Sequence, residues 1–298
     1  MIINNSIFVQ IHDNSTYKQP NFRNRLNEQN LLKNLSKDTY KAMDVYISNL
    51  LNVITNLNTL EIKDVVSAGI QKAKTSDKGT FYSYYSKILK DIIKQRGLTK
   101  SNNRENWYAE ITKKLLRDNN CVFHSESTYL DVGCGDCNIT KSIAQFVNFK
   151  PRNTYGIDLL EPKDFGEITR QQFDGGKIPS EIPSPDFVTL FQVLHHTKSQ
   201  KEAVTLLKSI YDKMNKEGYL LVREHEVRSV QDKKFWKFIH DLQCRIMGTA
   251  SEDLDNGTNY IPSTKWEKIF SRIGFKQICR YEDISYNDKS SYFMLLKK

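Results

Sequence analysis

The sequence predicts an α/β fold, with a seven-stranded, mostly parallel sheet whose last strand is antiparallel and with a helical region ahead of it. Two observations support this fold class. From Thr128 onward, short apolar strand-like segments alternate with amphipathic helical patterns, which is typical of a parallel sheet covered by helices on both faces. Before that point, apolar residues recur at the helical spacing of three or four.

Three regions follow one another along the chain. Residues 1–35 are polar and rich in Asn, and we expect a partly ordered lead-in. Residues 36–120 are expected to form a helical extension or lid, and residues 121–298 the α/β domain. The apolar residues that indicate helices in the extension are Met43, Ile47, Leu50, Ile54 and Leu57, then Ile88, Leu89, Ile92 and Ile93, and then Trp107, Ile111 and Leu115.

Seven apolar segments of the α/β domain are predicted to be strands. They cover residues 128–132, 154–158, 168–173, 186–193, 218–223, 275–281 and 291–296. The helices between them are indicated by the apolar faces of Ile139, Ile143 and Val147, of Ala203, Leu206, Leu207 and Ile210, and of Trp266, Ile269, Phe270 and Ile273.

The bulk composition excludes several classes of protein. A hydrophobic fraction of 39% and a mean hydropathy of −0.58 suit a soluble chain, and no stretch approaches the roughly 18–20 consecutive apolar residues of a membrane span. Residues 1–5 do not begin a secretory signal, so we expect an intracellular, cytoplasmic protein. The odd number of cysteines, five, favours reduced thiols.

The chain is basic, with a net charge of +9. Such a charge attracts polyanions, and RNA is the partner we expect, although a coding bias toward Asn, Lys, Ile and Tyr explains the same excess. The basic side chains assigned to RNA are Lys87, Lys90, Lys94, Arg96, Lys113 and Lys114. Aromatic residues that are able to stack on bases lie among them, namely Tyr82, Tyr84, Tyr85 and Trp107. A solvated helix face over buried aromatics is the competing interpretation.

The most informative segment runs from Tyr129 to Asn138, where a strand leads into a glycine turn and then a helix. Gly133 and Gly135 lack a Cβ, so the backbone turns tightly there and a ligand approaches closely. The N-terminus of the following helix offers unpaired N–H groups to a carboxylate. A nucleotide-like ligand is therefore expected across this turn, at the carboxyl edge of the sheet.

Three further segments support a nucleoside ligand. Asp158 ends the next strand, roughly 20 residues after the glycines, where a carboxylate accepts hydrogen bonds from both ribose hydroxyls. After the third strand, Asp174 is placed to receive an adenine amino group and Phe173 to pack on the ring. The fourth strand opens into polar residues at His195 and His196.

Together and in this order, these segments resemble the class I S-adenosylmethionine-dependent methyltransferases, over about residues 105–298. The His195-His196 pair and the segment from Pro262 to Phe275 are also similar to that family. The resemblance implies a Rossmann-like fold and S-adenosylmethionine as the cofactor. The cofactor site that it implies has Asp131, Gly133 and Gly135 around the methionine part, Asp158 on the ribose, Asp174 on the adenine, and Gln192, Val193 and Leu194 lining the pocket, with Cys134, Leu159 and Phe173 in the same site.

One position departs from the family's acidic-x-Gly-x-Gly-x-Gly pattern, because Cys137 stands where the third glycine would be. Cysteine is small, so we expect cofactor binding to survive. A nicotinamide site is the competing interpretation, but the last glycine of its Gly-x-Gly-x-x-Gly spacing is missing. Cys134 and Cys137 also match a redox or zinc pair, yet no second Cys/His pair at zinc-like spacing accompanies them, and we expect no metal.

Methyl transfer to a nucleophile is an in-line displacement, so the protein mainly holds donor and acceptor together with water excluded. A base is needed only where the acceptor loses a proton. The candidate catalytic residues are His195, His196 and Glu224, all expected at the edge of the sheet that holds the cofactor. A solvated strand end explains residues 223–226 equally well.

The acceptor that the sequence favours is RNA, including the mRNA cap, whose guanine N7 needs no base. The Asn/Asp-Pro-Pro-Tyr/Phe motif of base-amine methyltransferases is absent after the fourth strand, and the Lys-Asp-Lys-Glu set of ribose 2′-O enzymes is incomplete. The first alternative is a small-molecule O-, N- or C-methyltransferase with the N-terminal helices as a lid. The second is a catalytically silent subunit that binds RNA or a partner protein.

Overall fold

The computed structural model describes residues 58–75, 103–161, 167–247, 259–286 and 289–298, together with positions 37, 41, 42, 44–48, 87 and 91. The chain divides into two compact units. Residues 102–226, 258–283 and 290–298 form what we call the sheet unit, and residues 1–101, 227–257 and 284–289 form the second unit. In the described part of the chain, no helix combines the length and the apolar character needed to cross a membrane.

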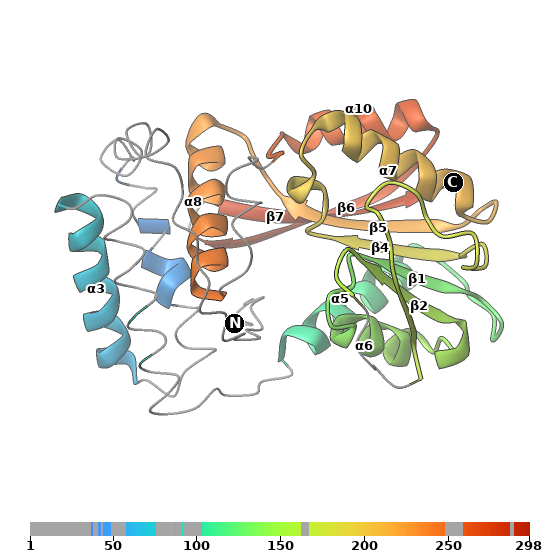
Figure 1. The fold of residues 1–298 in the computed structure, drawn as a ribbon, viewed down its shortest axis with the longest axis horizontal. Helices are drawn as coiled ribbons and strands as arrows, with labels where there is room; N and C mark the ends of the chain where they lie inside the picture. Colours follow the sequence, from blue (N-terminus) through green and yellow to red (C-terminus); the bar gives the residue numbers. More distant parts are fainter. Residues whose placement is uncertain are drawn as a thin grey trace. The chain divides into compact units, whose positions relative to one another are not determined.

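The sheet has seven strands in the order β3-β2-β1-β4-β5-β7-β6 (Figure 1). They are β1 Tyr129–Val132, β2 Thr154–Asp158, β3 Thr169–Gln172, β4 Phe187–Phe191, β5 Tyr219–His225, β6 Lys276–Tyr286 and β7 Lys289–Lys297. Parallel pairing joins β3 to β2, β2 to β1, β1 to β4 and β4 to β5, whereas β7 is antiparallel to β5. The predicted Rossmann-like, mostly parallel sheet with an antiparallel last strand is confirmed.

Helices cover both faces of this sheet. α5 (Asn103–Asp118) and α6 (Asn138–Val147) lie on one face, and α7 (Gln200–Lys213) and α10 (Ser263–Ile273) lie on the other (Figure 1). Two short 3-10 helices complete the unit, η1 (Pro151–Asn153) and η2 (Leu194–His196). All four helical patterns predicted between residues 103 and 273 are therefore present.

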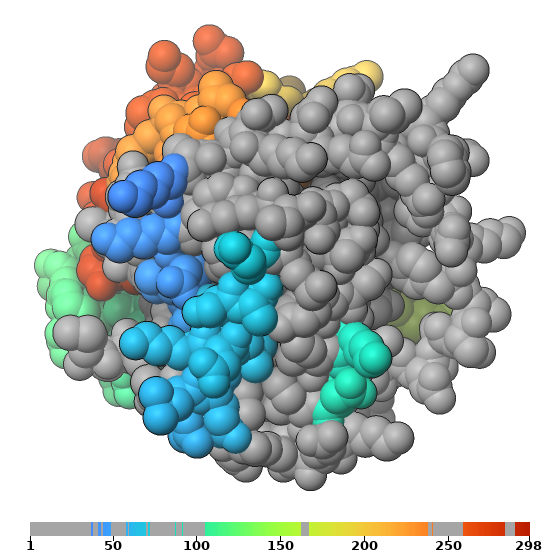
Figure 2. All heavy atoms as spheres, turned by 90° about the vertical axis from the view of Figure 1, so that its left-hand side faces the viewer, coloured from blue at the N-terminus to red at the C-terminus, as the bar shows by residue number. Residues whose placement is uncertain are grey.

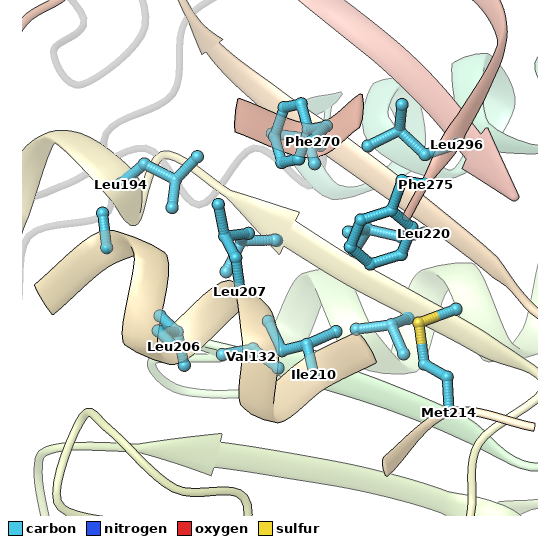
Figure 3. Packing of buried hydrophobic residues seen from close by; sticks show 14 of the residues in the cluster. Val132, Leu194, Leu206, Leu207, Ile210, Met214, Leu220, Phe270, Phe275 and Leu296 are labelled. Atoms are coloured by element: carbon cyan, nitrogen blue, oxygen red, sulfur yellow. The ribbon is translucent and has the colours of Figure 1, made fainter. Parts of the chain in front are cut away.

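Two apolar clusters fill the space between these layers. On the α7 side, Leu207, Ile210 and Phe270 converge on the sheet (Figure 3). Because successive side chains of a strand point to opposite faces, β5 supplies Leu220 to this cluster and Leu221 to the other. Each such side chain contributes roughly 1.5–3 kcal/mol when it is fully buried. This burial holds the strands rigid, so their carboxyl ends form a stable platform for a site.

α5 is attached to the sheet through Arg223 of β5, which is 3% exposed. Its guanidinium lies 5.1–5.5 Å from the ring centroids of Trp107, Tyr108 and Phe293, and Nη1 donates a hydrogen bond to the Tyr108 hydroxyl at 2.7 Å. Aromatic faces attract a guanidinium, which offsets part of its desolvation. α5 lies within the predicted N-terminal extension and belongs to the sheet unit.

The second unit contains α3 (Thr59–Thr75), seen in cyan at the surface in Figure 2, and α8 (Val230–Met247). α8 was not predicted, although a capping signal marks its start. The Ser229 hydroxyl accepts a hydrogen bond from the Asp232 N–H, and the Asp232 carboxylate accepts one from the Ser229 N–H. A Ser-x-x-Asp pair ahead of apolar residues at helical spacing was therefore available in the sequence.

Several predictions fall outside the described residues. Among the helix-forming positions and the residues assigned to RNA, these are Met43, Leu50, Ile54, Leu57, Tyr82, Tyr84, Tyr85, Ile88, Leu89, Lys90, Ile92, Ile93, Lys94 and Arg96.

Candidate functional site

The segment between β1 and α6 forms a tight loop at the carboxyl end of β1, where the strand order of the sheet reverses. Gly133 and Gly135 both have left-handed backbone, with φ of 77° and 54°. A Cβ on Gly133 would lie 2.4 Å from Cγ2 of Val193, whereas a Cβ on Gly135 would meet no heavy atom of the described residues within 4 Å. Gly133 is therefore required by close packing, and Gly135 borders open space.

Asp158, at the end of β2, lies next to this loop. Its Oδ2 accepts a hydrogen bond from the Gly135 N–H at 2.8 Å, and its Oδ1 accepts one from the Leu160 N–H at 3.0 Å. Each carboxylate oxygen has two lone pairs, so both oxygens retain capacity for a further donor. The structure thus brings the carboxylate predicted for a ribose and the glycine loop together.

Asp131, the acidic residue of the predicted motif, lies behind the loop. It is 4% exposed, and its two oxygens accept hydrogen bonds from Thr140 of α6 at 2.5 Å and from Thr189 of β4 at 2.7 Å. Burial raises the pKa of Asp131 to about 6, against the opposing effect of the two hydroxyl donors. The side chain therefore ties β1 to α6 and to β4.

Cys137 occupies the third glycine position and has the left-handed backbone, φ 56°, that glycine favours. Its Sγ lies 3.2 Å from the Sγ of Cys134, and both thiols are free and buried. A Cβ on Gly156 of β2 would lie 2.7 Å from each sulfur. The hydrogen bond with Cys137 and burial raise the pKa of the Cys134 thiol, and the two side chains fill space beneath the loop.

Asp174 and Phe173 follow β3. The Asp174 carboxylate accepts hydrogen bonds from the N–H groups of Lys177 at 2.9 Å and Gly176 at 2.8 Å, and these bonds lower its pKa. Phe173 is half-buried and packs against the cluster on the α7 side of the sheet. The turn therefore carries a fixed, ionised carboxylate beside an aromatic ring.

Leu159 joins this turn to the loop after β2. The side chain is 60% exposed, and its Cδ2 lies 3.1 Å from the position of a Cβ on Gly175. An exposed leucine beside Asp158 and the Asp174 turn provides an apolar surface between two carboxylates.

The chain after β4 turns sharply into η2. Gln192 has a φ of 58°, an uncommon conformation for a residue other than glycine, and its N–H donates to the Arg223 carbonyl at 2.7 Å. Its Nε2 lies 3.3 Å from Nε2 of His225. The turn directs Val193 onto Gly133, so the ends of β1 and β4 are in direct contact.

η2 places His195 against Glu224 of β5, and both residues are buried. Nδ1 of His195 lies 2.7 Å from Oε2 of Glu224, whose Oε1 accepts a hydrogen bond from the Leu194 N–H at 2.8 Å. Burial raises the pKa of Glu224. The charge of His195, its hydrogen bond and the hydrogen bond from the Leu194 N–H lower the pKa by a larger amount, so that it lies below its ordinary value.

Aromatic rings surround His195. The Tyr260 ring stacks on it at 5.1 Å with an interplanar angle of 10°, and the rings of His196 and His225 lie at 4.2 and 5.1 Å. The Asn259 N–H donates to the His195 carbonyl at 2.8 Å. His196 is exposed, so the two histidines that are adjacent in sequence have different environments.

Comparison with known families decides the identity of the chain. The family model described as "Methyltransferase domain" matches residues 102–279, which is more than half of the chain. The chain belongs to this methyltransferase family. This match identifies the chain as a methyltransferase.

Solved structures similar to this methyltransferase have low sequence identity to it. An S-adenosylmethionine-dependent methyltransferase from Clostridium acetobutylicum is 14% identical over 72% of this chain and 98% of that chain, with a TM-score of 0.45. One from Archaeoglobus fulgidus is 15% identical over 64% and 94%, with a TM-score of 0.42. The N-methyltransferase NodS from Bradyrhizobium japonicum, in complex with S-adenosyl-L-homocysteine, is 12% identical over 65% and 87%, with a TM-score of 0.43. No curated protein sequence matches the chain.

Two residues of the methyltransferase that the sequence did not single out hold the site from β3, the edge strand. Arg170 donates from Nε to the Gly135 carbonyl at 2.9 Å and from Nη1 to the Glu161 carbonyl at 2.6 Å, and Gln172 donates to the Leu159 carbonyl at 2.8 Å. The signal was the polar strand Thr-Arg-Gln-Gln, because strands of parallel sheets are usually apolar. These side chains link the loop after β1 to the loop after β2.

Proposed function

We propose that the methyltransferase binds S-adenosylmethionine across the loop of Gly133 and Gly135, with the ribose on Asp158. The observation that carries this proposal is the hydrogen bond between the Gly135 N–H and Asp158, beside open space at Gly135 where an added Cβ would meet no heavy atom of the described residues within 4 Å. The N-terminus of α6 is suited to the methionine carboxylate. The other residues assigned to the site are Leu159, Phe173 and Asp174 at the adenine, Gln192 and Val193 along the pocket, and Asp131 and Cys134 as support from behind the loop.

Calorimetric titration with S-adenosyl-L-homocysteine tests this site. Asp158→Ala removes the ribose acceptor and the partner of the Gly135 N–H, so we expect the Kd to rise by roughly 10- to 100-fold, as for the loss of hydrogen bonds to a charged group. Glu181→Ala, at an exposed position, is the matched control and should leave the Kd unchanged. Equal affinity of wild type and Asp158→Ala would contradict the proposal.

We infer that the acceptor is RNA. The support is the net charge of +9 and the exposure of the basic side chains assigned to RNA that the structure describes, Lys87, Lys113 and Lys114. Asp118 forms ion pairs with Lys114 at 2.5 Å and with Arg117 at 3.0 Å, which neutralises part of this surface. The test is the binding of a single-stranded RNA at increasing salt, where release of counterions makes the affinity fall steeply. Binding that is insensitive to salt, or absent, would contradict an RNA acceptor.

A small molecule is the second candidate acceptor, and the buried His195–Glu224 pair favours it. An enclosed acid–base pair suits an acceptor that enters a pocket from which water is excluded. Transfer of a radiolabelled methyl group to phenols but not to RNA would support it, and binding of S-adenosyl-L-homocysteine without transfer to any acceptor would indicate a silent subunit.

A further inference from the structure

Cys134 and Cys137 form a pair of thiols beneath the glycine loop. Cys137 Sγ donates a hydrogen bond to Cys134 Sγ at 3.2 Å, and both residues are buried free cysteines. The other two cysteines of the sheet unit contact Asn119 instead. Cys121 Sγ lies 3.9 Å from the Asn119 carbonyl, and the Asn119 amide donates to Cys279 Sγ at 3.2 Å. Cys134 and Cys137 are therefore placed to react with each other.

Strand β2 leaves these two sulfurs in contact. Gly156 has no side chain, and a Cβ there would lie 2.7 Å from each Sγ, so no side chain at this position separates them. From 3.2 Å, the sulfurs need to approach by only roughly 1.1 Å to reach the S–S bond length of about 2.05 Å. Zinc takes four ligands, and in the described part of the chain no group of three or more metal-binding side chains includes either cysteine. The geometry therefore suits a disulfide better than a metal.

We propose that Cys134 and Cys137 are a modification site, at which a peroxide oxidises the two thiols to a disulfide and thereby weakens the binding of the methyl donor. The effect on the donor rests on the proposed function, because it requires the donor to lie across the glycine loop. The formation of the disulfide does not depend on it.

The oxidant is hydrogen peroxide. One sulfur, as its thiolate, attacks a peroxide oxygen, so that the O–O bond breaks, an S–OH group forms and hydroxide leaves. The other sulfur attacks the sulfur of this group, so that the S–S bond forms and the S–O bond breaks. The two sulfurs together lose two electrons to the peroxide, and both thiol protons end in the two water molecules that are released.

The environment of the pair sets the pace of this reaction. Cys134 is 7% exposed and Cys137 is 0% exposed, so peroxide reaches the pair from the side of Cys134. The hydrogen bond with Cys137, burial and the nearby charges of Asp131 and Asp158 raise the pKa of the Cys134 thiol. The pair should therefore react more slowly than an exposed thiol, and the oxidation is carried to its end point.

The disulfide would close a ring over residues 134–137, and backbone hydrogen bonds hold both ends of this ring. The Cys134 N–H donates to the Ile157 carbonyl of β2 at 3.1 Å. The Cys137 carbonyl accepts a hydrogen bond from the Lys141 N–H of α6 at 2.9 Å. The ends are thus attached to a strand and to a helix, so the residues between them take up the change that ring closure imposes.

Gly135 lies between the two ends. It has no Cβ and borders open space, so its backbone has more freedom than that of its neighbours. Its N–H donates to Asp158 at 2.8 Å and its carbonyl accepts from Arg170 at 2.9 Å, and both partners are side chains that are able to follow a displacement. Asp158 is the carboxylate assigned to the ribose of the donor. A displaced Gly135 therefore alters the contact at which the donor binds.

The number of free thiols tests the disulfide in the full chain. The tryptic peptide of residues 118–141 contains three cysteines, Cys121, Cys134 and Cys137. After alkylation with N-ethylmaleimide under denaturing conditions, the peptide from the reduced chain should carry a label on each of them. After treatment with hydrogen peroxide, only Cys121 should be labelled, and dithiothreitol should restore the other two labels.

Calorimetric titration with S-adenosyl-L-homocysteine tests the effect on the donor site. The Kd should be roughly tenfold higher for the oxidised chain, as for the loss of a hydrogen bond to a charged group, and dithiothreitol should reverse the change. Binding and oxidation are reciprocal, so saturating S-adenosyl-L-homocysteine should raise the reduction potential of the pair, by about 30 mV for a tenfold ratio of Kd. The count of labels in glutathione buffers of known potential measures this shift.

Two variants show whether this pair is responsible. Cys137→Gly restores the family's third glycine at a position with left-handed backbone, φ 56°, so it should fold, and it lacks the second thiol. Its Kd should be the same before and after treatment with peroxide. Cys279→Ala removes a partly buried thiol of β6 that lies outside the donor site, and it should respond to peroxide as wild type does.

Three results would overturn the proposal: labels on both Cys134 and Cys137 after peroxide, a disulfide that leaves the Kd and the reduction potential unchanged, or a response to peroxide that persists in Cys137→Gly. Failure of the reduced wild-type chain to bind S-adenosyl-L-homocysteine would instead overturn the proposed function and, with it, the effect on the donor. The count of labels would still decide whether the disulfide forms, so the two failures are distinguishable.

Discussion

A Cβ atom on Gly156 would lie 2.7 Å from the Sγ atom of Cys137. The side chain at the third glycine position of the loop therefore occupies the space that a side chain in the middle of β2 would need. Cys134 contributes the second sulfur at the same distance. A cysteine is tolerated in the loop because β2 has no side chain at the contact. The departure from the family pattern at residue 137 and the glycine at 156 are thus physically linked.

Gly156→Ala is expected to lower the free energy of unfolding by roughly 1–3 kcal/mol, because the added methyl group overpacks the space of two thiols. In a Cys134→Ala/Cys137→Ala background, the same substitution should cost less, since both sulfurs are gone. Urea denaturation of the four proteins gives the coupling energy directly. An equal cost in both backgrounds would show that the thiols are not what excludes a side chain from position 156.

Substitutions at the two loop glycines should separate stability from binding. Gly133→Ala meets Val193 at 2.4 Å and adds left-handed strain of roughly 1–2 kcal/mol, so we expect a clear loss of thermal stability. Gly135→Ala adds strain of the same order without a clash among the described residues, and its methyl group enters the proposed cofactor space. Compared with Gly133→Ala, Gly135→Ala should therefore weaken the binding of S-adenosyl-L-homocysteine more and lower the stability less. The reverse order would argue against a ligand at Gly135.

Asp131 should make stability depend on pH between about 4 and 6. Burial raises its pKa from 3.8 to about 6, so the folded state binds this proton more tightly than the unfolded state. The resulting stabilisation, roughly 3 kcal/mol, is fully present below pH 4 and is lost as the pH rises through 6. Asn at this position does not titrate, so the free energy of unfolding of Asp131→Asn relative to wild type should increase from pH 4 to pH 7. Urea denaturation at both pH values measures this difference, and a constant difference would refute the argument.

Arg170 should contribute to donor binding although it lies on the edge strand. Arg170→Ala removes the hydrogen bond to the Gly135 carbonyl, which releases the loop that presents the Gly135 N–H to Asp158. Loss of about 1.5 kcal/mol corresponds to a roughly tenfold higher Kd for S-adenosyl-L-homocysteine. Hydrogen exchange at the Gly135 amide should accelerate in the same variant, and Arg170→Lys should recover part of the affinity. Arg272→Ala, an exposed arginine of α10, serves as the control, and unchanged affinity in Arg170→Ala would rule out the role.

Much of the fold, and the conformation of the glycine loop, follow from local patterns. The alternation of apolar segments predicts all seven strands and the helices α5, α6, α7 and α10, because side-chain periodicity is a property of neighbouring residues. Gly133 and Gly135 are recognisable for the same reason, since a left-handed turn needs glycine wherever it occurs. The missed helix, α8, carried its own capping signal at Ser229 and Asp232.

The sequence by itself determined the order of elements, the glycine loop and the carboxylate at the end of β2, because these depend on spacings of a few residues and on the conformations that single residues allow. Only the tertiary structure decided that Asp131 faces Thr140 and Thr189, that Arg170 holds the loop, and that Glu224 pairs with His195 across 29 residues of chain. Such pairings depend on which strands become neighbours and in what register, and the physical reason is that register is set by packing of the whole sheet and not by any local segment.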